Sequence, residues 1–226
     1  MGSLLFSAVI PDPAIIASTD RFVVIDKPPG MLSVPGKGEH KQDCAVSRVR
    51  ARFPDATGPM VVHRLDMETS GLMLVALDPG AQRELSGQFE RRTVEKSYTA
   101  LLDGDVYADE GEINLPMRAD IERRPYQIID HVHGRQAITR FRVLAREVDR
   151  TRVEFSPVTG RCHQLRVHAA APRTLHENGG LACPILGDAL YGDPASAPRL
   201  MLHATRLSFL DLGTNARIEF ASAAPF

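Results

Sequence analysis

The sequence predicts an α+β fold built on a central mixed, largely antiparallel β-sheet flanked by helices and loops. Short segments with strand patterns outnumber helical segments across the 226 residues. Strands and helices also do not alternate regularly, as they would in a parallel α/β fold. The composition, with 43% hydrophobic and 24% charged residues, is that of a globular protein long enough to bury a sizeable core.

The N-terminal part of the chain is expected to contain an arm, a strand and a helix. Residues 1–20 are mixed in character and are expected to form an arm or a short edge element. Phe22-Val23-Val24-Ile25 predicts a strand, and the Pro-Pro-Gly sequence soon after it predicts a turn. Asp43 is expected to cap a helix whose apolar residues follow at helical spacing and which Pro54 ends.

Two apolar segments enclose a short charged sequence in the next part of the chain. Residues 60–62 read Met-Val-Val, and residues 72–77 are six apolar residues with the length of a buried strand. Asp78, followed by proline, then predicts the start of a second helix. The charged sequence at 63–68 is therefore expected to lie in a turn between two buried, strand-like segments.

The rest of the chain is expected to consist mainly of strands and loops. Residues 172–183 are polar and rich in glycine, which predicts a loop. The strand patterns fall at residues 94–102, 138–144, 152–155, 200–203, 207–210 and 218–220.

Charge, cysteine content and hydropathy exclude several classes of protein. The net charge of −1 shows that the chain as a whole is no polycation. The three cysteines form no CxxC pair, so neither a disulfide framework nor a zinc site is signalled. No apolar run reaches the ~18 residues that a membrane span needs, and the N-terminus has no signal-peptide pattern. We therefore expect a cytoplasmic protein without a membrane partner.

The arginines are unevenly distributed along the chain. Residues 118–152 hold nine arginines against five acids, whereas residues 103–112 hold five acids and no base. This arrangement suits a protein that steers a polyanion to one face. It suits a solvated pair of strands equally well, and the sequence favours neither interpretation.

Asp66 is the carboxylate best placed for chemistry, because it lies in the polar turn between the apolar segments. A carboxylate there serves as a nucleophile, a general base or a structural partner of a cation. His63 and Arg64 are near in sequence, and Arg161 and Arg166 lie in a distant stretch. An arginine partner would keep the carboxylate ionised at neutral pH. Spacing alone favours a structural ion pair over a catalytic role.

No pattern in the sequence predicts a cofactor or a metal ion. The pairs His131/His133 and His163/His168 lack acidic neighbours at metal-ligand spacing. Gly36-Lys37-Gly38 lacks the third glycine of a phosphate-binding loop, and no Gly-x-Ser-x-Gly elbow is present. The residues therefore point to cofactor-free chemistry on an anionic substrate.

Six motifs, in order along the chain, resemble those of the RluA family of pseudouridine synthases. Residues 63–71, His-Arg-Leu-Asp-Met-Glu-Thr-Ser-Gly, are similar to the family signature His-Arg-Leu-Asp-x-x-Thr-Ser-Gly. The other five are DKPPG at 26–30, KSYTA at 96–100, GRCHQLRVH at 160–168, PILGD at 184–188 and LMLHA at 200–204. The resemblance implies the pseudouridine synthase catalytic fold over residues 21–226. Residues 1–20 are then an arm too short for the S4 RNA-binding domain that many relatives carry.

The resemblance implies a role for each of three residues. Asp66 matches the catalytic aspartate, which attacks the uridine at the base or at the ribose C1′, or promotes formation of a glycal. The glycosidic bond then breaks, and the uracil rotates and rejoins the ribose through C5 without a cofactor. Tyr98 matches the tyrosine that stacks on the target base and is a candidate acceptor of the C5 proton. Arg166 matches the arginine that pairs with the catalytic aspartate.

The resemblance also implies contacts with structured RNA. Arg64 matches a residue that fills the gap left by the flipped nucleotide, whose extrusion costs a few kcal/mol. His63 and Arg161 are expected to contact the RNA, and Leu202 is expected to belong to a hydrophobic wall. The short chain resembles the branch that modifies a tRNA anticodon stem-loop and a 23S rRNA hairpin. We expect it to act as a monomer, with the arginines of 118–152 contacting the RNA backbone.

The chain departs from the family pattern in several places. Cys162 stands where the family usually has Thr or Ser, at an expected helix N-cap, and is expected to be a buried, inert thiol. Cys183 stands where the family usually has His, and residues 172–180 resemble an insertion. Residues 123–129 keep only part of the branch's Arg-Pro-Lys pattern, which leaves the exact RNA target open.

Two classes of function remain after these considerations. The first is an RNA pseudouridine synthase, and the second is an RNA-binding or RNA-refolding protein of the same fold with little catalysis. Asp66, Tyr98 and Arg166 together favour the enzyme, because binding alone needs no reactive carboxylate. A metal hydrolase that uses the histidines is disfavoured.

Overall fold

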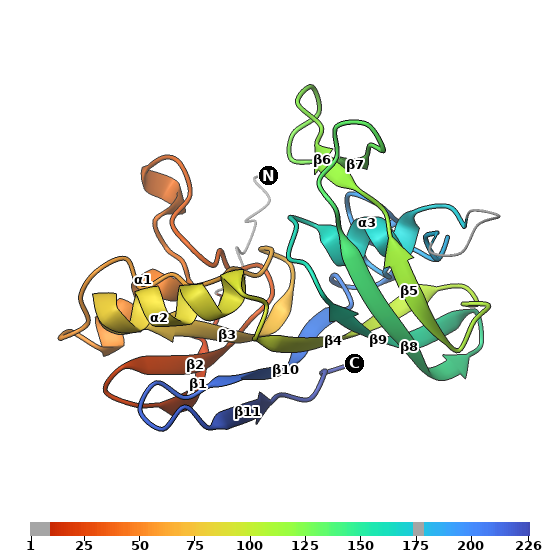
Figure 1. The fold of residues 1–226 in the computed structure, drawn as a ribbon. Coiled ribbons are helices and arrows are strands. Elements are labelled where there is room, and N and C mark those ends of the chain that lie inside the picture. Colours follow the sequence, from red (N-terminus) through yellow and green to blue (C-terminus); the bar gives the residue numbers. More distant parts are fainter. Residues whose placement is uncertain (1–9, 174–178) are drawn as a thin grey trace, which may run out of the picture.

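A computed structural model describes residues 10–173 and 179–226 of the chain (Figure 1). The helices are α1 (Ala45–Arg52), α2 (Pro79–Glu90) and α3 (Gln164–Ala170), with single 3₁₀ turns η1 (Glu39–Lys41) and η2 (Pro194–Ser196). The strands are β1 (Ala14–Ser18), β2 (Phe22–Lys27), β3 (Ser70–Ala76), β4 (Glu95–Asp103), β5 (Glu110–Asn114), β6 (Met117–Ala119), β7 (Gln127–Ile129), β8 (Ile138–Glu147), β9 (Arg150–Pro157), β10 (Leu202–Leu210) and β11 (Arg217–Ala221).

A nine-stranded mixed sheet runs through the described part of the molecule. Its strand order is β1-β2-β3-β10-β4-β9-β8-β5, with β11 paired to β10. β3 and β10 pair in parallel, and the other neighbours in this sheet are antiparallel. β6 and β7 form a separate hairpin. The predicted α+β fold with a mixed, largely antiparallel sheet is confirmed.

The helices α1 and α2 cover opposite faces of β2 and β3. Successive side chains of a strand point to opposite faces of its sheet. Val23 and Ile25 share an apolar cluster with the buried residues of α1, and Phe22 and Val24 share another with those of α2. This two-sided burial explains why β3 is apolar along its length and is buried at every residue.

The centre of the sheet joins two parts of the molecule. In Figure 1, β4 and β10 lie between the part with β1–β3, α1 and α2 and the part with β5, β8, β9 and α3. The second part has its own apolar cluster, which includes Leu102, Phe155 and Leu165. Tyr98 of β4 contacts both this cluster and the one beside α1, so it lies at the junction.

The two expected helix N-caps have different outcomes. Asp78 caps α2 as predicted, because its carboxylate accepts the Ala81 N–H at 2.8 Å. α1 is capped by Cys44 rather than Asp43, so that prediction is wrong by one residue. The Cys44 sulfur accepts the Ser47 N–H, and the Ser47 hydroxyl accepts the Cys44 N–H. The Asp43 carboxylate instead binds the Arg48 guanidinium, with both contacts at 2.7 Å.

Several strand predictions need correction. Residues 60–62 form only an isolated bridge from Val61 to Val75, and Met60 has a φ of 61°, which breaks an extended strand. The two strands expected at 200–203 and 207–210 are one strand, β10, with an irregularity after Ala204. For residues 1–20, by contrast, the expected short edge element is found as β1 in the described part, and residues 1–9 lie outside the described residues. The expected insertion at 172–180 is described only in part.

The acidic and arginine-rich segments face each other across β5 and β8. Glu112 lies opposite Arg140 in the strand register, and their side chains form an ion pair at 3.3 Å. Arg142 and Arg146 also bind acidic side chains, those of Glu154 and Asp109. For β8, the solvated strand pair is therefore the correct interpretation.

The hairpin region retains some free arginines. Arg118 and Arg123 are paired with aspartates, whereas Arg124 and Arg135 are exposed and form no ion pair with a described residue. The predicted contact of the 118–152 segment with an RNA backbone therefore depends mainly on these last two. Among the described residues, no helix has both the length and the apolar character to cross a bilayer.

Candidate active site

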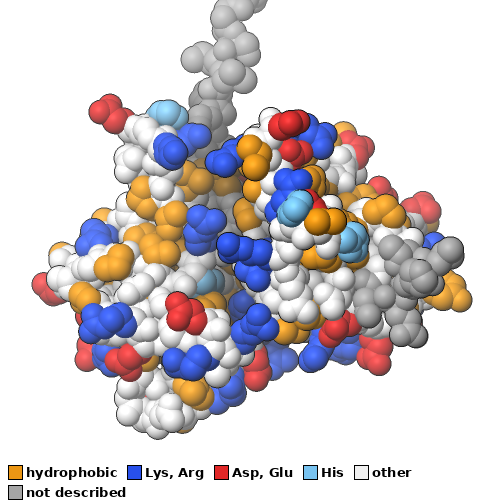
Figure 2. Space-filling model, turned by 45° about the horizontal axis from the view of Figure 1, so that its top comes forward, with side chains coloured by type: hydrophobic (Ala, Val, Ile, Leu, Met, Phe, Trp, Pro, Cys, Tyr) orange, Lys and Arg blue, Asp and Glu red, His pale blue; other side chains and the backbone are white. Residues whose placement is uncertain are grey.

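A cavity of about 580 Å³ opens where the turn 63–69, the strand β4 and the segment 157–166 meet. Lys and Arg side chains gather along the middle of the face in Figure 2. Five basic side chains line the cavity against two acidic ones, which gives it a positive field. The predicted site residues all line it: His63, Arg64, Asp66, Tyr98, Arg161, Arg166 and Leu202.

The turn that carries Asp66 is held in place by a buried lysine. Lys27, at the end of β2, donates hydrogen bonds to the carbonyls of Pro28, Met31 and Met67 at 2.8–3.0 Å. Met67 is the residue after Asp66, so this bond fixes the turn at the site. Burial lowers the pKa of Lys27 to about 8, against the charges of Glu68 and Asp66, so the amine is largely protonated at neutral pH.

Lys27→Met is expected to lower the free energy of unfolding by about 3 kcal/mol, because three carbonyls lose their shared donor. Urea unfolding of the variant and the wild type measures this loss. The exposed Lys37 provides the control, since Lys37→Met is expected to leave the unfolding midpoint nearly unchanged. Equal midpoints for the Lys27 variant and the wild type would show that the turn is held by other contacts.

His63 is an uncharged anchor rather than a cation. Its Nε2 accepts the Leu74 N–H of β3 at 2.9 Å, and its ring stacks on Phe89 of α2 with centroids 4.6 Å apart. Burial and the positive charge of Lys96 lower the pKa of His63 to about 3. His63 therefore lines the cavity and connects β3 to α2, but it adds no positive charge for RNA at neutral pH.

His63 is expected to make the protein less stable as the pH falls. Its pKa in the folded state, about 3, lies below the ordinary value of 6.5. Between these values the unfolded chain binds the extra proton, so stability decreases as the pH falls through this window. His63→Gln keeps a hydrogen-bond acceptor but does not titrate in this range. The slope of the free energy of unfolding against pH should therefore decrease by an amount that corresponds to up to one bound proton. Urea unfolding at several pH values tests this, and equal slopes for both proteins would contradict it.

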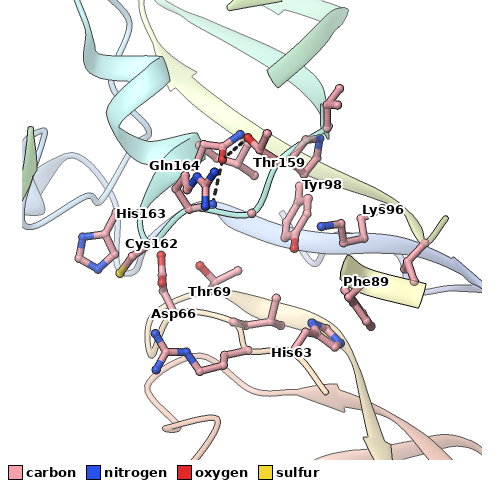
Figure 3. Close-up of a pocket in the computed structure, with 18 of the residues that line it drawn as sticks. His63, Asp66, Thr69, Phe89, Lys96, Tyr98, Thr159, Cys162, His163 and Gln164 are labelled. Atoms are coloured by element: carbon pink, nitrogen blue, oxygen red, sulfur yellow. Dashed lines mark hydrogen bonds between the residues drawn. The ribbon is translucent and has the colours of Figure 1, made fainter. Parts of the chain in front are cut away.

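Asp66 comes together with the adjacent residues Cys162 and His163, which lie almost a hundred residues later in the sequence. One oxygen, sulfur or nitrogen atom from each lies within 4.8 Å of the others. Figure 3 shows the Cys162 side chain between those of His163 and Asp66. The Nδ1 atom of His163 is hydrogen-bonded to the Tyr191 hydroxyl at 2.8 Å. The backbone of His163 has a φ of 54°, which turns the chain sharply before α3 begins.

Two predictions about Cys162 are wrong. The N-cap of α3 is His163, which makes no side-chain cap bond, because its left-handed backbone moves the start of the helix one residue on. Cys162 is exposed rather than buried. Partial desolvation and the charge of Asp66 raise the pKa of its thiol, while Arg64 and Arg166 oppose them. At neutral pH, Cys162 is therefore a protonated thiol.

Arg166 binds Asp188 rather than Asp66 in this structure. Its Nε and Nη2 atoms donate to the two carboxylate oxygens of Asp188 at 2.8 and 2.5 Å, and both side chains are buried. Burial opposes the charge of Arg166, but the hydrogen bonds and charge of Asp188 outweigh it and raise the pKa of Arg166. Asp66 adds to this effect at longer range. The expected direct pair with Asp66 is therefore replaced by an electrostatic contact.

Tyr98 and Leu202 form part of the apolar lining of the cavity. Tyr98 is on β4 and Leu202 on the neighbouring β10, where it lies opposite Ala100. Figure 3 shows Tyr98 pointing toward the turn that carries Thr69. Burial and the nearby charge of Asp66 raise the pKa of Tyr98 well above its ordinary value. Tyr98 is therefore a neutral phenol at any physiological pH.

Sequence reasoning missed some residues that shape the site. Gln164 ties the start of α3 to the loop after β9 and to the start of β8, because its amide accepts from the Thr159 hydroxyl at 2.7 Å and donates to the Ile138 carbonyl at 2.9 Å. Lys96 lines the cavity two residues before Tyr98, and burial lowers its pKa. Gln164, Lys96 and Asp188 all lie within the quoted motifs, but a motif does not tell which of its residues contact each other.

Comparisons with known proteins show which family the chain resembles. The family model for RNA pseudouridylate synthase matches residues 21–171. The dual-specificity RNA pseudouridine synthase RluA of Pasteurella multocida is 44% identical over 94% of this chain and 93% of its own length, and that of Escherichia coli K12 is 40% identical over the same shares. The structure of human RNA Pseudouridylate Synthase Domain Containing 1 has a TM-score of 0.74 and 28% identity, over 96% of this chain and 85% of its own. The resemblance read from the six motifs is thus confirmed over most of the chain, which belongs to the RNA pseudouridylate synthase family of isomerases.

Proposed function

We propose that this protein converts uridine to pseudouridine in a tRNA anticodon stem-loop and in a 23S rRNA hairpin. The observation that carries the proposal is the convergence of Asp66, Tyr98 and Arg166 on one positively charged cavity. The relatives named above are described as dual-specificity RNA pseudouridine synthases, which supports two RNA substrates. A protein that only bound or refolded RNA would need no reactive carboxylate lining its cavity.

The size of the cavity supports the entry of a single nucleotide. Its volume of about 580 Å³ lies in the range of small-molecule sites. A cavity of this size is far too small to hold a stacked RNA helix. The target uridine therefore has to leave its stack, and Arg64, which is exposed at the edge of the cavity, fills the gap that it leaves.

Asp66 is assigned as the group that starts the reaction. Its carboxylate is only partly buried and lines the cavity, so a flipped uridine can reach it. The reaction breaks the bond from C1′ to N1, rotates the uracil and forms a bond from C1′ to C5. The C5 proton is lost and N1 gains one, so nothing is oxidised and no cofactor is required. Whether Asp66 attacks C1′, attacks the base or promotes a glycal, it acts at the same place.

Tyr98 is assigned to stacking rather than to proton transfer. Its raised pKa keeps the phenol protonated, and a protonated phenol is a poor acceptor for the C5 proton. Its ring, between the two apolar clusters, offers a rigid surface for the uracil. Leu202 on the adjacent strand extends this surface. After the glycosidic bond has been broken and the new bond to C5 has formed, the Asp66 carboxylate is free again. It is the carboxylate assigned to accept the C5 proton.

Arg166 and Arg161 are assigned to positioning and RNA binding. Asp188 fixes the Arg166 guanidinium through two hydrogen bonds, so its charge is held near Asp66 without moving when the substrate enters. Arg161 uses its Nε to bind the Gln136 carbonyl at 3.1 Å, which leaves its terminal nitrogens for a phosphate.

We also propose that residues 21–226 form one catalytic domain that acts as a cytoplasmic monomer. One sheet contains strands from β2 to β11, which supports one domain, and β1 of the N-terminal segment pairs with its edge. The proposed RNA substrates are cytoplasmic in bacteria, which supports the location.

The experiment is the release of tritium from RNA labelled at C5 of uridine. The anticodon stem-loop and the 23S rRNA hairpin are tested separately and then in competition. Release from both RNAs, with each competing against the other, is the expected result, because one cavity would serve both. Release from one alone would restrict the specificity, and release from neither would overturn the proposed substrates.

A further inference from the structure

Asp66, Cys162 and His163 offer an oxygen, a sulfur and a nitrogen atom within 4.8 Å of one another. Carboxylate, thiolate and imidazole are the ligands that Zn²⁺ and related cations prefer. The motif resemblance implies Thr or Ser at position 162, and the cysteine found there supplies the sulfur of this set of ligands. None of the roles assigned above uses Cys162 or His163.

One ring nitrogen of His163 is held by a neighbouring side chain, which is compatible with ligation through the other. Its Nδ1 is 2.8 Å from the Tyr191 hydroxyl, and that hydroxyl also accepts the Gln127 N–H at 2.8 Å. Among the described residues, Nε2 of His163 has no hydrogen-bond partner. When Nδ1 carries the proton and donates it to Tyr191, Nε2 is free to bind a metal, which is the arrangement of ligating histidines in general.

The separations of the three ligand atoms, all within 4.8 Å, can be compared with those of a closed metal site. Tetrahedral zinc with bonds of 2.0–2.3 Å has ligand atoms about 3.3–3.8 Å apart. Closing the gap needs a movement of about 1 Å, and the exposed side chain of Cys162 can turn to supply it. A fourth position would remain open to water on the cavity side.

The surrounding charges leave room for a cation. Arg166 is buried and donates two hydrogen bonds to the Asp188 carboxylate, whose negative charge offsets that of the guanidinium. Arg64 is exposed and can turn toward solvent. Binding would add the charge of the Cys162 thiolate to that of Asp66, and so offset most of the charge of a divalent ion.

We propose that Asp66, Cys162 and His163 form a binding site for a thiophilic divalent cation such as Zn²⁺, and that the bound cation inhibits the enzyme. Binding breaks the S–H bond of Cys162, forms a sulfur–metal bond and releases one proton to solvent. The metal also binds the Asp66 carboxylate, which is then no longer available to the uridine. The inhibition rests on the proposed role of Asp66, whereas the binding does not.

Binding is tested by titrating the full-length protein with Cd²⁺ and recording the ultraviolet charge-transfer band of a cadmium–thiolate bond. The band is expected for the wild type and for the control Cys183→Ala, whose cysteine is buried elsewhere. It is expected to be absent from Cys162→Thr, which carries a residue usual in the family, and to weaken in His163→Ala. A band of equal strength in Cys162→Thr and the wild type, or no band in either, would overturn the site.

Inhibition is tested by tritium release from the anticodon stem-loop in the presence of Zn²⁺. The concentration that halves the activity is expected to be at least about tenfold higher for Cys162→Thr than for the wild type, since one of three ligands is lost. Equal sensitivity of the two proteins would overturn the inhibition. If the wild type released no tritium even without metal, the proposed function would fail, while the cadmium band would still report the site.

Discussion

Asp66→Asn is expected to reduce pseudouridine formation on the order of 10³-fold or more while RNA binding is retained. The asparagine has almost the same shape, so the turn and its bond from Lys27 to the Met67 carbonyl should persist. An amide is neither a nucleophile nor a base at neutral pH, so the reaction loses its first step. Tritium release gives the rate, and a binding titration with the same RNA gives the affinity.

Glu68 provides the matched control for this substitution. It is a second carboxylate in the same turn, but it does not line the cavity. Glu68→Gln is expected to keep the rate within a few fold of the wild type. If both substitutions reduced the rate equally, loss of negative charge in the turn would be the cause, and Asp66 would have no specific role.

Asp188→Asn is expected to produce the largest loss of stability, about 3 kcal/mol or more. Asp188 is completely buried, and removing its charge leaves the buried Arg166 guanidinium without a counter-ion. Breaking a buried ion pair by removing one partner costs about 3–5 kcal/mol. Asparagine still accepts the backbone N–H groups of Leu190 and Tyr191, which bind the carboxylate in the wild type, so the loss reports mainly on the charge.

The matched control for this prediction is a pair on the surface. Arg206 and Glu219 form an ion pair at 2.6 Å, but both side chains are about half exposed. Glu219→Gln is therefore expected to change the free energy of unfolding by less than about 1 kcal/mol. Urea unfolding of both variants measures the difference. A small loss for Asp188→Asn would mean that water reaches Arg166 and that the pair does not hold the site.

The fold class and the central elements of the sheet could be predicted because their signals are strong and local. β3 and its neighbour β2 are apolar on both faces, and the Asp78 cap of α2 depends on residues adjacent in sequence. The strands β5, β6 and β7 were not predicted. β5 reads Glu-Gly-Glu-Ile-Asn, whose alternating exposed acids are explained only by their arginine partners on β8, and β6 and β7 have three residues each.

The members of the site could be predicted from the motifs, but their contacts could not. Which carboxylate binds Arg166 depends on how α3 packs beside the segment that carries Asp188, and nothing in the local sequence around residue 166 specifies this. The same holds for His63, whose charge state follows from its burial between β3 and α2. The exposure of Cys162 follows from the left-handed backbone of His163, which no sequence pattern announced.

The most direct test of the central claim is nucleoside analysis of the anticodon stem-loop after incubation with the wild-type protein. The account predicts that one uridine per RNA is replaced by pseudouridine, with one equivalent of tritium released from C5 and no cofactor added. An RNA that binds tightly to the protein but keeps all of its uridine would contradict the account. The protein would then be an RNA-binding or RNA-refolding protein with the fold of the family.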